Sequence, residues 1–217
     1  MEQKNKKDFL PILLYIIIFF GIQLLFGIYL GFTQEIGNTL SDKTLSIINI
    51  VSYFAIFLTL IIIYYNKLIQ DIKRINKKDI TYIVISAVVL IVLNFIISNL
   101  FVSLNVEMEN QDTVVNLLNN YKLLTIISII LFAPVTEEIV YRYSLSTLFK
   151  NKALFIIISS VIFGAMHGLG IVTILYVLMG IILAFCYLKT DKNIISSIII
   201  HILNNISGVL TMMILIN

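Results

Sequence analysis

The stretch LFAPVTEEIVYRYSL, residues 131–145, carries two adjacent glutamates and an arginine inside a long apolar run. The chain around it has 217 residues, of which 59% are hydrophobic and only 12% are charged, and its mean hydropathy is +1.02. Soluble domains have roughly a quarter of their residues charged, whereas apolar runs long enough to cross a bilayer recur along this chain. The composition therefore predicts an all-α, polytopic membrane helix bundle, with residues 1–217 as a single integral membrane domain.

The apolar runs predict about seven transmembrane helices. The first follows the basic segment MEQKNKKD, but it is too long for the core of a signal peptide, and we interpret it as a retained span. The segment 105–121 has spaced apolar residues and predicts a short amphipathic helix on the outer surface. Gly27 and Gly31 form a GxxxG pattern that predicts close helix packing. The expected spans are 9–32, 44–65, 80–104, 122–149, 153–169, 171–188 and 194–216.

The basic residues predict the orientation in the cell membrane. With the N-terminus in the cytoplasm, the inner segments hold all of the 15 lysines and arginines except Lys43 and Lys122. The net charge of +3 then reflects membrane topology, and we expect no nucleic-acid partner. The single Cys186 cannot form an internal disulfide.

Charges inside a span need an explanation, because each costs roughly 2.5–3.5 kcal/mol at the centre of a membrane helix. Glu138 and Arg142 are four residues apart, so they share a helix face and are predicted to pair. Glu137 points about 100° away, and no lysine or arginine at comparable depth offers it a partner. Pro134 lacks an N–H, so we expect a kink that leaves the carbonyl of Ile130 without its helical partner.

Both histidines of the chain also lie in predicted spans. His167 follows Phe163 by four residues in FGAMH, and flanking glycines predict a close approach by another helix. His201 precedes Asn205 by four residues in HILNN, so those two share a face. Each histidine alone is more simply a hydrogen-bonded structural residue. Ionisable groups at similar depth on several helices together indicate a site within the membrane.

These residue types suit the hydrolysis of an amide bond by water. A desolvated Glu137 is suited to act as a general base, one histidine could hold the water, and the other histidine with Asn205 could donate hydrogen bonds to an oxyanion. Glu137, His167 and His201 are equally the ligand types of an open zinc site, although the chain has no HExxH pattern. The residues alone leave both mechanisms open, with a divalent metal such as zinc as the one conceivable cofactor.

The motifs EEIVYR, FGAMH and HILNN occur in the order EExxxR, FxxxH and HxxxN. This order resembles the CPBP family of intramembrane peptidases, which includes type II CAAX prenyl endopeptidases and bacteriocin-processing or self-immunity proteins. The resemblance covers about residues 120–210 and implies that Glu137 is the base, with His167, His201 and Asn205 around it and with Glu138, Arg142 and Phe163 in support. One departure is Tyr143, which stands where many members have glycine.

We therefore expect an intramembrane endopeptidase that acts on a membrane-associated protein or peptide in contact with lipid. Two other classes fit the same sequence: a non-catalytic membrane protein that confers immunity by binding, and a proton-coupled transporter that uses Glu137 and the histidines as a relay. The absence of evident repeats speaks against the commoner transporter folds. The peptidase hypothesis makes a geometric prediction. Glu137, His167, His201 and Asn205 should meet around one polar cavity, with Glu138 turned away toward Arg142.

Overall fold

The structure is a computed structural model that describes residues 8–33, 42–104, 109–168 and 170–216. All regular elements in these ranges are helices. Five of them are long and apolar enough to cross a membrane, and two apolar helices are shorter. The predicted all-α membrane bundle is confirmed. The five long stretches are Leu10–Phe32, Ile47–Arg74, Lys77–Phe101, Tyr121–Ser144 and Ile194–Ile214, and the shorter helices are Lys152–Ala165 and Thr173–Lys189.

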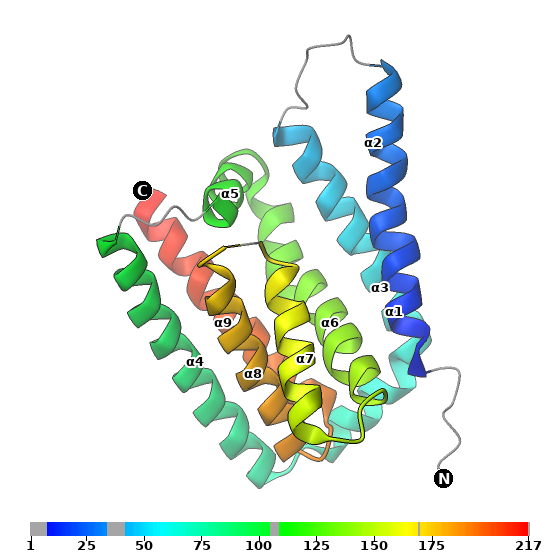
Figure 1. Cartoon of the computed structure of the whole chain (residues 1–217), viewed down its shortest axis with the longest axis vertical. Helices are drawn as coiled ribbons and strands as arrows, with labels where there is room; N and C mark the ends of the chain where they lie inside the picture. The colour runs from blue at the N-terminus through cyan, green and yellow to red at the C-terminus, as the bar shows by residue number, and fades with distance from the viewer. Residues whose placement is uncertain (1–7, 34–41, 105–108, 169, 217) are drawn as a thin grey trace.

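The first two spans stand together at one side of the bundle (Figure 1). Helix α1 (Leu10–Leu14), the π-helix η2 (Tyr15–Phe20) and α2 (Gly21–Thr33) form one rod that packs against α3 (Asp42–Arg74). The predicted GxxxG packing on this rod is wrong for the described residues, because a Cβ at Gly27 or Gly31 would meet no atom within 4 Å. The upper part of this rod is therefore loosely packed.

The remaining elements build the larger part of the bundle, in which α4 and α9 lie side by side (Figure 1). The central span changes its helical register several times, and α7 and α8 form a hairpin. The bounds are α4 Lys77–Ser103, α5 Glu109–Ile127, η3 Ser128–Phe132, α6 Ala133–Glu138, η4 Ile139–Ser144, α7 Lys152–Ala165, α8 Thr173–Lys189 and α9 Ile194–Ile216.

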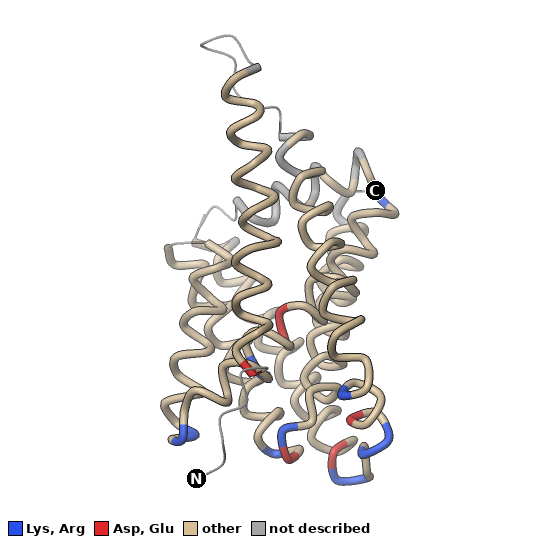
Figure 2. The backbone as a smooth tube through the Cα atoms, turned by 90° about the vertical axis from the view of Figure 1, so that its right-hand side faces the viewer, with Lys and Arg blue, Asp and Glu red and all other residues tan. Residues whose placement is uncertain are grey.

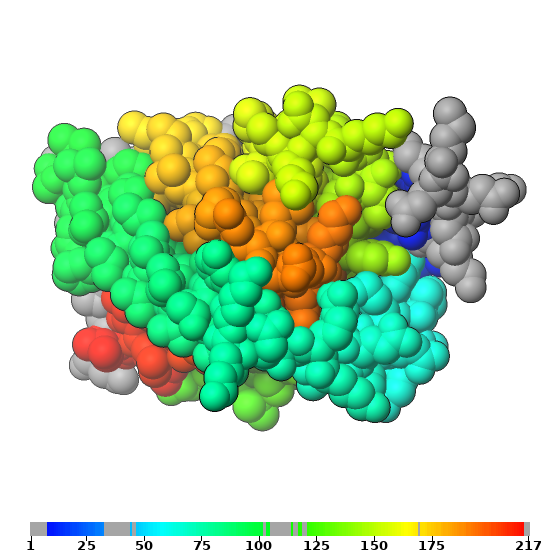
Figure 3. Space-filling view, turned by 90° about the horizontal axis from the view of Figure 1, so that it is seen from below, coloured from blue at the N-terminus to red at the C-terminus, as the bar shows by residue number. Residues whose placement is uncertain are grey.

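The α7–α8 hairpin is shorter than the predicted spans 153–169 and 171–188. Gly168 and Gly170 have φ angles of +138° and +127°, which L side chains rarely adopt, so the backbone turns there. The two helices pack closely, since a Cβ on Gly164 would lie 2.5 Å from Val177 and one on Gly180 would lie 2.8 Å from the backbone of Ser160. Seen from the opposite end, α8 lies between α7 and α4 (Figure 3).

The predicted span 122–149 also differs from the structure. Helix α5 already begins at Glu109, and non-helical angles at Tyr121 (φ −141°, ψ 48°) separate a short helix from the span. This short helix matches part of the amphipathic segment predicted at 105–121, of which residues 105–108 lie outside the described ranges. The central span ends at Ser144 and not at the predicted residue 149. It contains two π-helical segments, η3 and η4, where one continuous α-helix was expected.

Basic residues gather at one end of the molecule, the end at which the described chain starts (Figure 2). A buried carboxylate organises this end. Asp71 pairs with Lys67 and, at 2.9 Å, with Arg74, and it accepts a hydrogen bond of 3.0 Å from the backbone N–H of Ile194. These bonds hold the start of α9 against the end of α3. They thereby set the position of the α9 side chains along the axis of the bundle.

Candidate active site

The two central glutamates lie on α6, between two π-helical segments, and both are buried, with 2% of Glu137 and 0% of Glu138 exposed. In η3 the N–H of Ala133 bonds the carbonyl of Ser128, five residues back. In that register the N–H missing from Pro134 would have bonded Ile129, and not Ile130 as predicted for an α-helix. The amide of Asn205 donates to this Ile129 carbonyl at 2.8 Å. Asn205 thus replaces the bond that proline removes.

Both histidines approach the same oxygen of Glu137. The Nε2 atoms of His167 and His201 each lie 3.8 Å from its Oε2. His201 lies on α9 as predicted, whereas His167 lies just beyond the end of α7 at Ala165. The structure therefore brings together three of the four residues that were expected to meet. In the described part, Asn205 donates to the Ile129 carbonyl and accepts from Asn204 Nδ2 at 3.4 Å.

The partners of the two rings fix their tautomers. His167 Nδ1 lies 2.8 Å from the carbonyl of Phe163, and His201 Nδ1 lies 3.0 Å from Glu138 Oε1. A carbonyl and a carboxylate only accept hydrogen bonds, so both Nδ1 atoms carry the proton. In the neutral rings each Nε2 then presents a lone pair toward Glu137. Three acceptors converge on one point, which is an arrangement that calls for a hydrogen-bond donor between them.

Glu138 has two partners where one was predicted. Its Oε2 lies 3.2 Å from Arg142 Nε, as the four-residue spacing indicated, and its Oε1 orients His201. Arg142 is fully buried, and its guanidinium lies 5.0 Å from the centre of the Phe163 ring. The same ring lies 4.5 Å from that of His167 and 5.7 Å from that of His201. Phe163 thus packs against both histidines and the ion pair.

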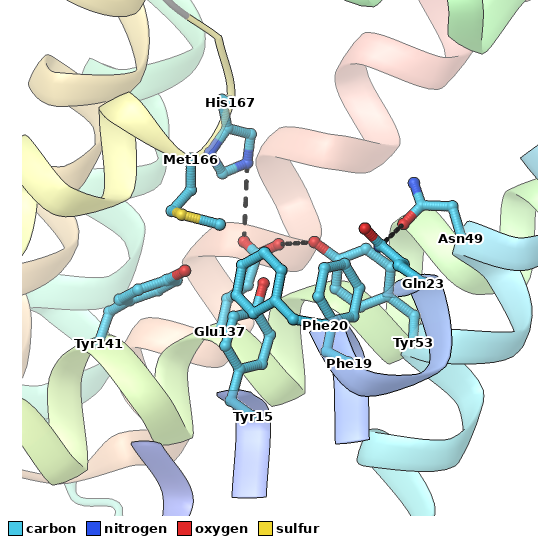
Figure 4. A pocket seen from close by; sticks show the side chains of 10 residues that line it. All are labelled: Tyr15, Phe19, Phe20, Gln23, Asn49, Tyr53, Glu137, Tyr141, Met166 and His167. Carbon is cyan, nitrogen blue, oxygen red and sulfur yellow. Dashed lines mark hydrogen bonds and ion pairs between the residues drawn. The ribbon is translucent and has the colours of Figure 1, made fainter. Parts of the chain in front are cut away.

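A cavity of about 290 Å³ opens on Glu137 and His167 (Figure 4). The hydroxyl of Tyr53 donates to Glu137 Oε1 at 2.7 Å, which leaves Oε2 for the histidines. The first two spans supply most of the wall, although the sequence motifs lie elsewhere. The lining residues are Tyr15, Phe19, Phe20, Gln23, Asn49, Tyr53, Glu137, Tyr141, Met166 and His167.

The fit of a metal can be judged from the donor set. The two Nε2 lone pairs and the carboxylate have suitable chemistry, and outer hydrogen bonds on both Nδ1 atoms are common in metal sites. Zinc ligands at about 2.0–2.2 Å would lie roughly 3.4 Å from one another in a tetrahedral site, closer than the 3.8 Å found here. Among the described residues no group of three or more His, Cys, Asp or Glu is arranged to hold a metal ion. We therefore derive no step of the reaction from a metal.

The comparison with known protein families points to one match. Residues 119–207 match the family described as type II CAAX prenyl endopeptidase Rce1-like. This match covers less than half of the 217 residues, and over it the chain is similar to that family. No curated protein and no solved structure matches the chain. The match covers α6, α7, α8 and most of α9, and the resemblance of the three motifs to CPBP intramembrane peptidases is confirmed.

Tyr143, the one departure noted from the resembled motif, has clear contacts in the structure. Its hydroxyl donates to Asp8 Oδ1 at 3.4 Å, and its ring makes an edge contact with that of Tyr64 at 5.5 Å. The Nζ atom of Lys67 lies 5.6 Å from the ring centre. Tyr143 is absent from the cavity wall, and it instead joins the start of the first span to α3.

Sequence reasoning missed two contacts of the candidate site. Tyr53 lies outside the matched region, and nothing in its surroundings distinguishes it from other tyrosines of an apolar span. The sequence placed Asn205 on the same helix face as His201, but the Nδ1 of His201 lies 3.0 Å from Glu138 Oε1. The available signal was that Glu138 and His201 are both ionisable at similar depth, which favours pairing in a membrane.

Proposed function

We propose that the chain is an intramembrane endopeptidase in which Glu137 activates water to attack a peptide bond. One observation carries this proposal: the buried Oε2 of Glu137, which has no hydrogen-bond partner among the described residues, faces the Nε2 atoms of both histidines at 3.8 Å. A water oxygen can lie about 2.8 Å from two atoms at that separation. The two O–H groups of such a water could donate to Glu137 and to one of the histidines.

Glu137 can carry the proton that the reaction transfers from water to the leaving amine. Glu137 takes a proton from the water while the water oxygen bonds to the carbonyl carbon. Glu137 then passes that proton to the amine nitrogen when the C–N bond breaks. A histidine can stabilise the oxyanion only when its Nε2 is protonated. His201 is the better candidate, because its Nδ1 lies 3.0 Å from the Glu138 carboxylate, which fixes the orientation of the ring. His167 has a side chain that is 19% exposed and lines the cavity where the substrate enters.

Small membrane-bound peptides are the substrate class that we propose, such as a bacteriocin leader, a propeptide or a remnant signal peptide. The test compares proteoliposomes that contain either the wild-type chain or the Glu137→Gln variant, each fused with membranes of the source cell. Mass spectrometry of peptide termini should reveal new termini within apolar sequences for the wild type only. Identical sets of termini would contradict the proposal. A metal chelator added to the same assay tests whether zinc contributes.

The two alternative functions give different results in the same variant. An immunity protein that acts by binding should keep its protective effect after Glu137→Gln, because the shape of the side chain is preserved. A proton-coupled transporter should lose its activity, but the wild type should generate no new peptide termini. The peptidase is the only one of the three that loses both the phenotype and the termini.

Removal of one hydroxyl tests the positioning of the base. In Tyr53→Phe the ring contact with Phe19 is retained, but the 2.7 Å bond to Glu137 is lost. The carboxylate can then rotate, and misplacement of a catalytic group lowers the rate. We expect kcat to fall by roughly tenfold with a smaller change in KM, measured on a peptide found in the terminus experiment. A loss confined to KM would assign Tyr53 to substrate binding instead.

The orientation in the membrane can be tested by cysteine labelling. The concentration of basic residues at one end predicts a cytoplasmic N-terminus. In a Cys186→Ser background, a cysteine in place of Asn110 should react with an impermeant thiol reagent on intact cells. Cysteines in place of Ile72 or Asn151 should react only after lysis. The reverse pattern would show that the chain is inserted the other way.

A further inference from the structure

Two amide side chains face the cavity from the first two spans. Gln23 on α2 and Asn49 on α3 both line it, together with Glu137 and His167 (Figure 4). Gln23 is half-buried, Asn49 is exposed, and both belong to stretches that are long and apolar enough to cross a membrane. Polar side chains in such stretches are rare and usually mark a site or a pathway.

The two amides satisfy little of each other's hydrogen-bonding capacity. Gln23 Nε2 donates to Asn49 Oδ1 at 3.5 Å, which is the long limit of a hydrogen bond. Each amide carries two N–H donors and one carbonyl acceptor. Within the described part of the chain, the pair thus keeps both an acceptor, on Gln23, and N–H donors, on both residues, for another group.

The position of the pair relative to the reacting bond follows from α3. Asn49 and Tyr53 are four residues apart and share a helix face, and Tyr53 bonds Glu137. One turn of four residues corresponds to about 6 Å along the helix, and an extended chain advances about 3.3 Å per residue. The amides therefore lie about two residues of extended peptide away from the group that is proposed to activate water.

We propose that Gln23 and Asn49 form a subsite that binds the backbone of an extended peptide about two residues from the scissile bond. This inference rests on the proposed peptidase function. A peptide must be unwound before water can reach its carbonyl, and its freed N–H and C=O groups then face a hydrocarbon environment that cannot satisfy them. An amide pair offers a donor and an acceptor at once, which matches a peptide group of any sequence.

A lipid chain would not use this chemistry. A prenyl or acyl chain has neither donors nor acceptors, so it would fill the aromatic part of the wall, Phe19 and Phe20, and leave both amides unsatisfied. The Gln23–Asn49 pair thus favours a peptide over a lipid as the occupant of this end of the cavity.

Binding of a defined peptide tests the subsite. The probe is a capped octapeptide of leucine and alanine with one tryptophan, whose emission is distinct because the chain contains no tryptophan. Anisotropy is measured with the Glu137→Gln chain in phosphatidylcholine nanodiscs, and the signal of empty discs is subtracted. Adding Gln23→Leu and Asn49→Leu together should weaken binding by roughly tenfold. A twin peptide with methylated backbone nitrogens should bind weakly to both chains.

The matched control is Asn99→Leu. Asn99 is an exposed amide in the α4 span, and its side chain bonds the Phe95 carbonyl of its own helix at 2.7 Å; its replacement should leave peptide binding unchanged. Equal binding by the double variant and its parent would overturn the subsite. The subsite would also be overturned if the double variant lost binding of a dansylated fatty acid but still bound the peptide. That result would assign the site to lipid. Since the background chain is expected not to hydrolyse peptides, neither result depends on the terminus experiment.

Discussion

Glu137→Gln is expected to lower the rate of peptide hydrolysis by roughly 10²–10⁴-fold, the contribution typical of a general base. The melting temperature should stay unchanged or rise. A glutamine oxygen can still accept the Tyr53 hydroxyl, and its NH₂ group would point toward two Nε2 lone pairs that now face a carboxylate. Hydrolysis of an identified peptide and thermal unfolding in detergent measure the two effects.

The neighbouring substitution Glu138→Gln is the control, because it makes the same chemical change one residue further along. It should lower the melting temperature, since it weakens the pairing with Arg142, and it should also slow hydrolysis through its effect on His201. If both variants lost stability equally and both kept their activity, the division of roles between the two glutamates would be wrong.

Arg142→Ala is expected to destabilise the folded chain by about 3–5 kcal/mol, because it leaves the fully buried Glu138 without its cationic partner. Arg142→Lys should recover only part of this loss, since lysine lacks the planar guanidinium that stacks near Phe163. Denaturation in mixed micelles, followed by helical circular dichroism, provides the comparison. Arg142→Ala would contradict the role of the pair if it unfolded at the same denaturant concentration as the wild type.

Lys67→Ala provides a matched comparison for the arginine variant. Lys67 and Asp71 have the same four-residue spacing as the buried pair, but the Lys67 side chain is 30% exposed. Asp71 also keeps Arg74 at 2.9 Å when Lys67 is removed. Since Lys67 is partly exposed and Asp71 keeps a second cation, we expect Lys67→Ala to cost about 0–1 kcal/mol, well below the cost of Arg142→Ala.

Local spacing explains which features the sequence could predict. The Glu138–Arg142 pair follows from one helical turn. The convergence of Glu137 with two histidines follows from the cost of placing ionisable groups in lipid separately. Both arguments need only the helices and their approximate depth.

The features that escaped prediction depend on rotation and register. Tyr53 and Glu137 are 84 residues apart in the sequence. Which side chain of α3 meets Glu137 depends on how α3 and α6 are rotated about their own axes. Whether Pro134 frees Ile129 or Ile130 depends on a change from α to π register, which leaves no mark in composition. The close helix packing expected at Gly27 and Gly31 is absent among the described residues for a similar reason. Small residues permit another helix to approach closely but do not cause it to do so.

The short α7–α8 hairpin has a consequence for the bilayer itself. Helix α7 has 14 residues and is therefore about 21 Å long, whereas the hydrocarbon layer is about 30 Å thick. Such a hydrophobic mismatch is relieved by local thinning of the membrane. His167 lies beside the turn of this hairpin, so we expect such thinning to bring headgroups and their hydration water toward the histidine that lines the cavity. A peptidase surrounded by lipid could in this way obtain water, its second substrate, through a locally thinned bilayer.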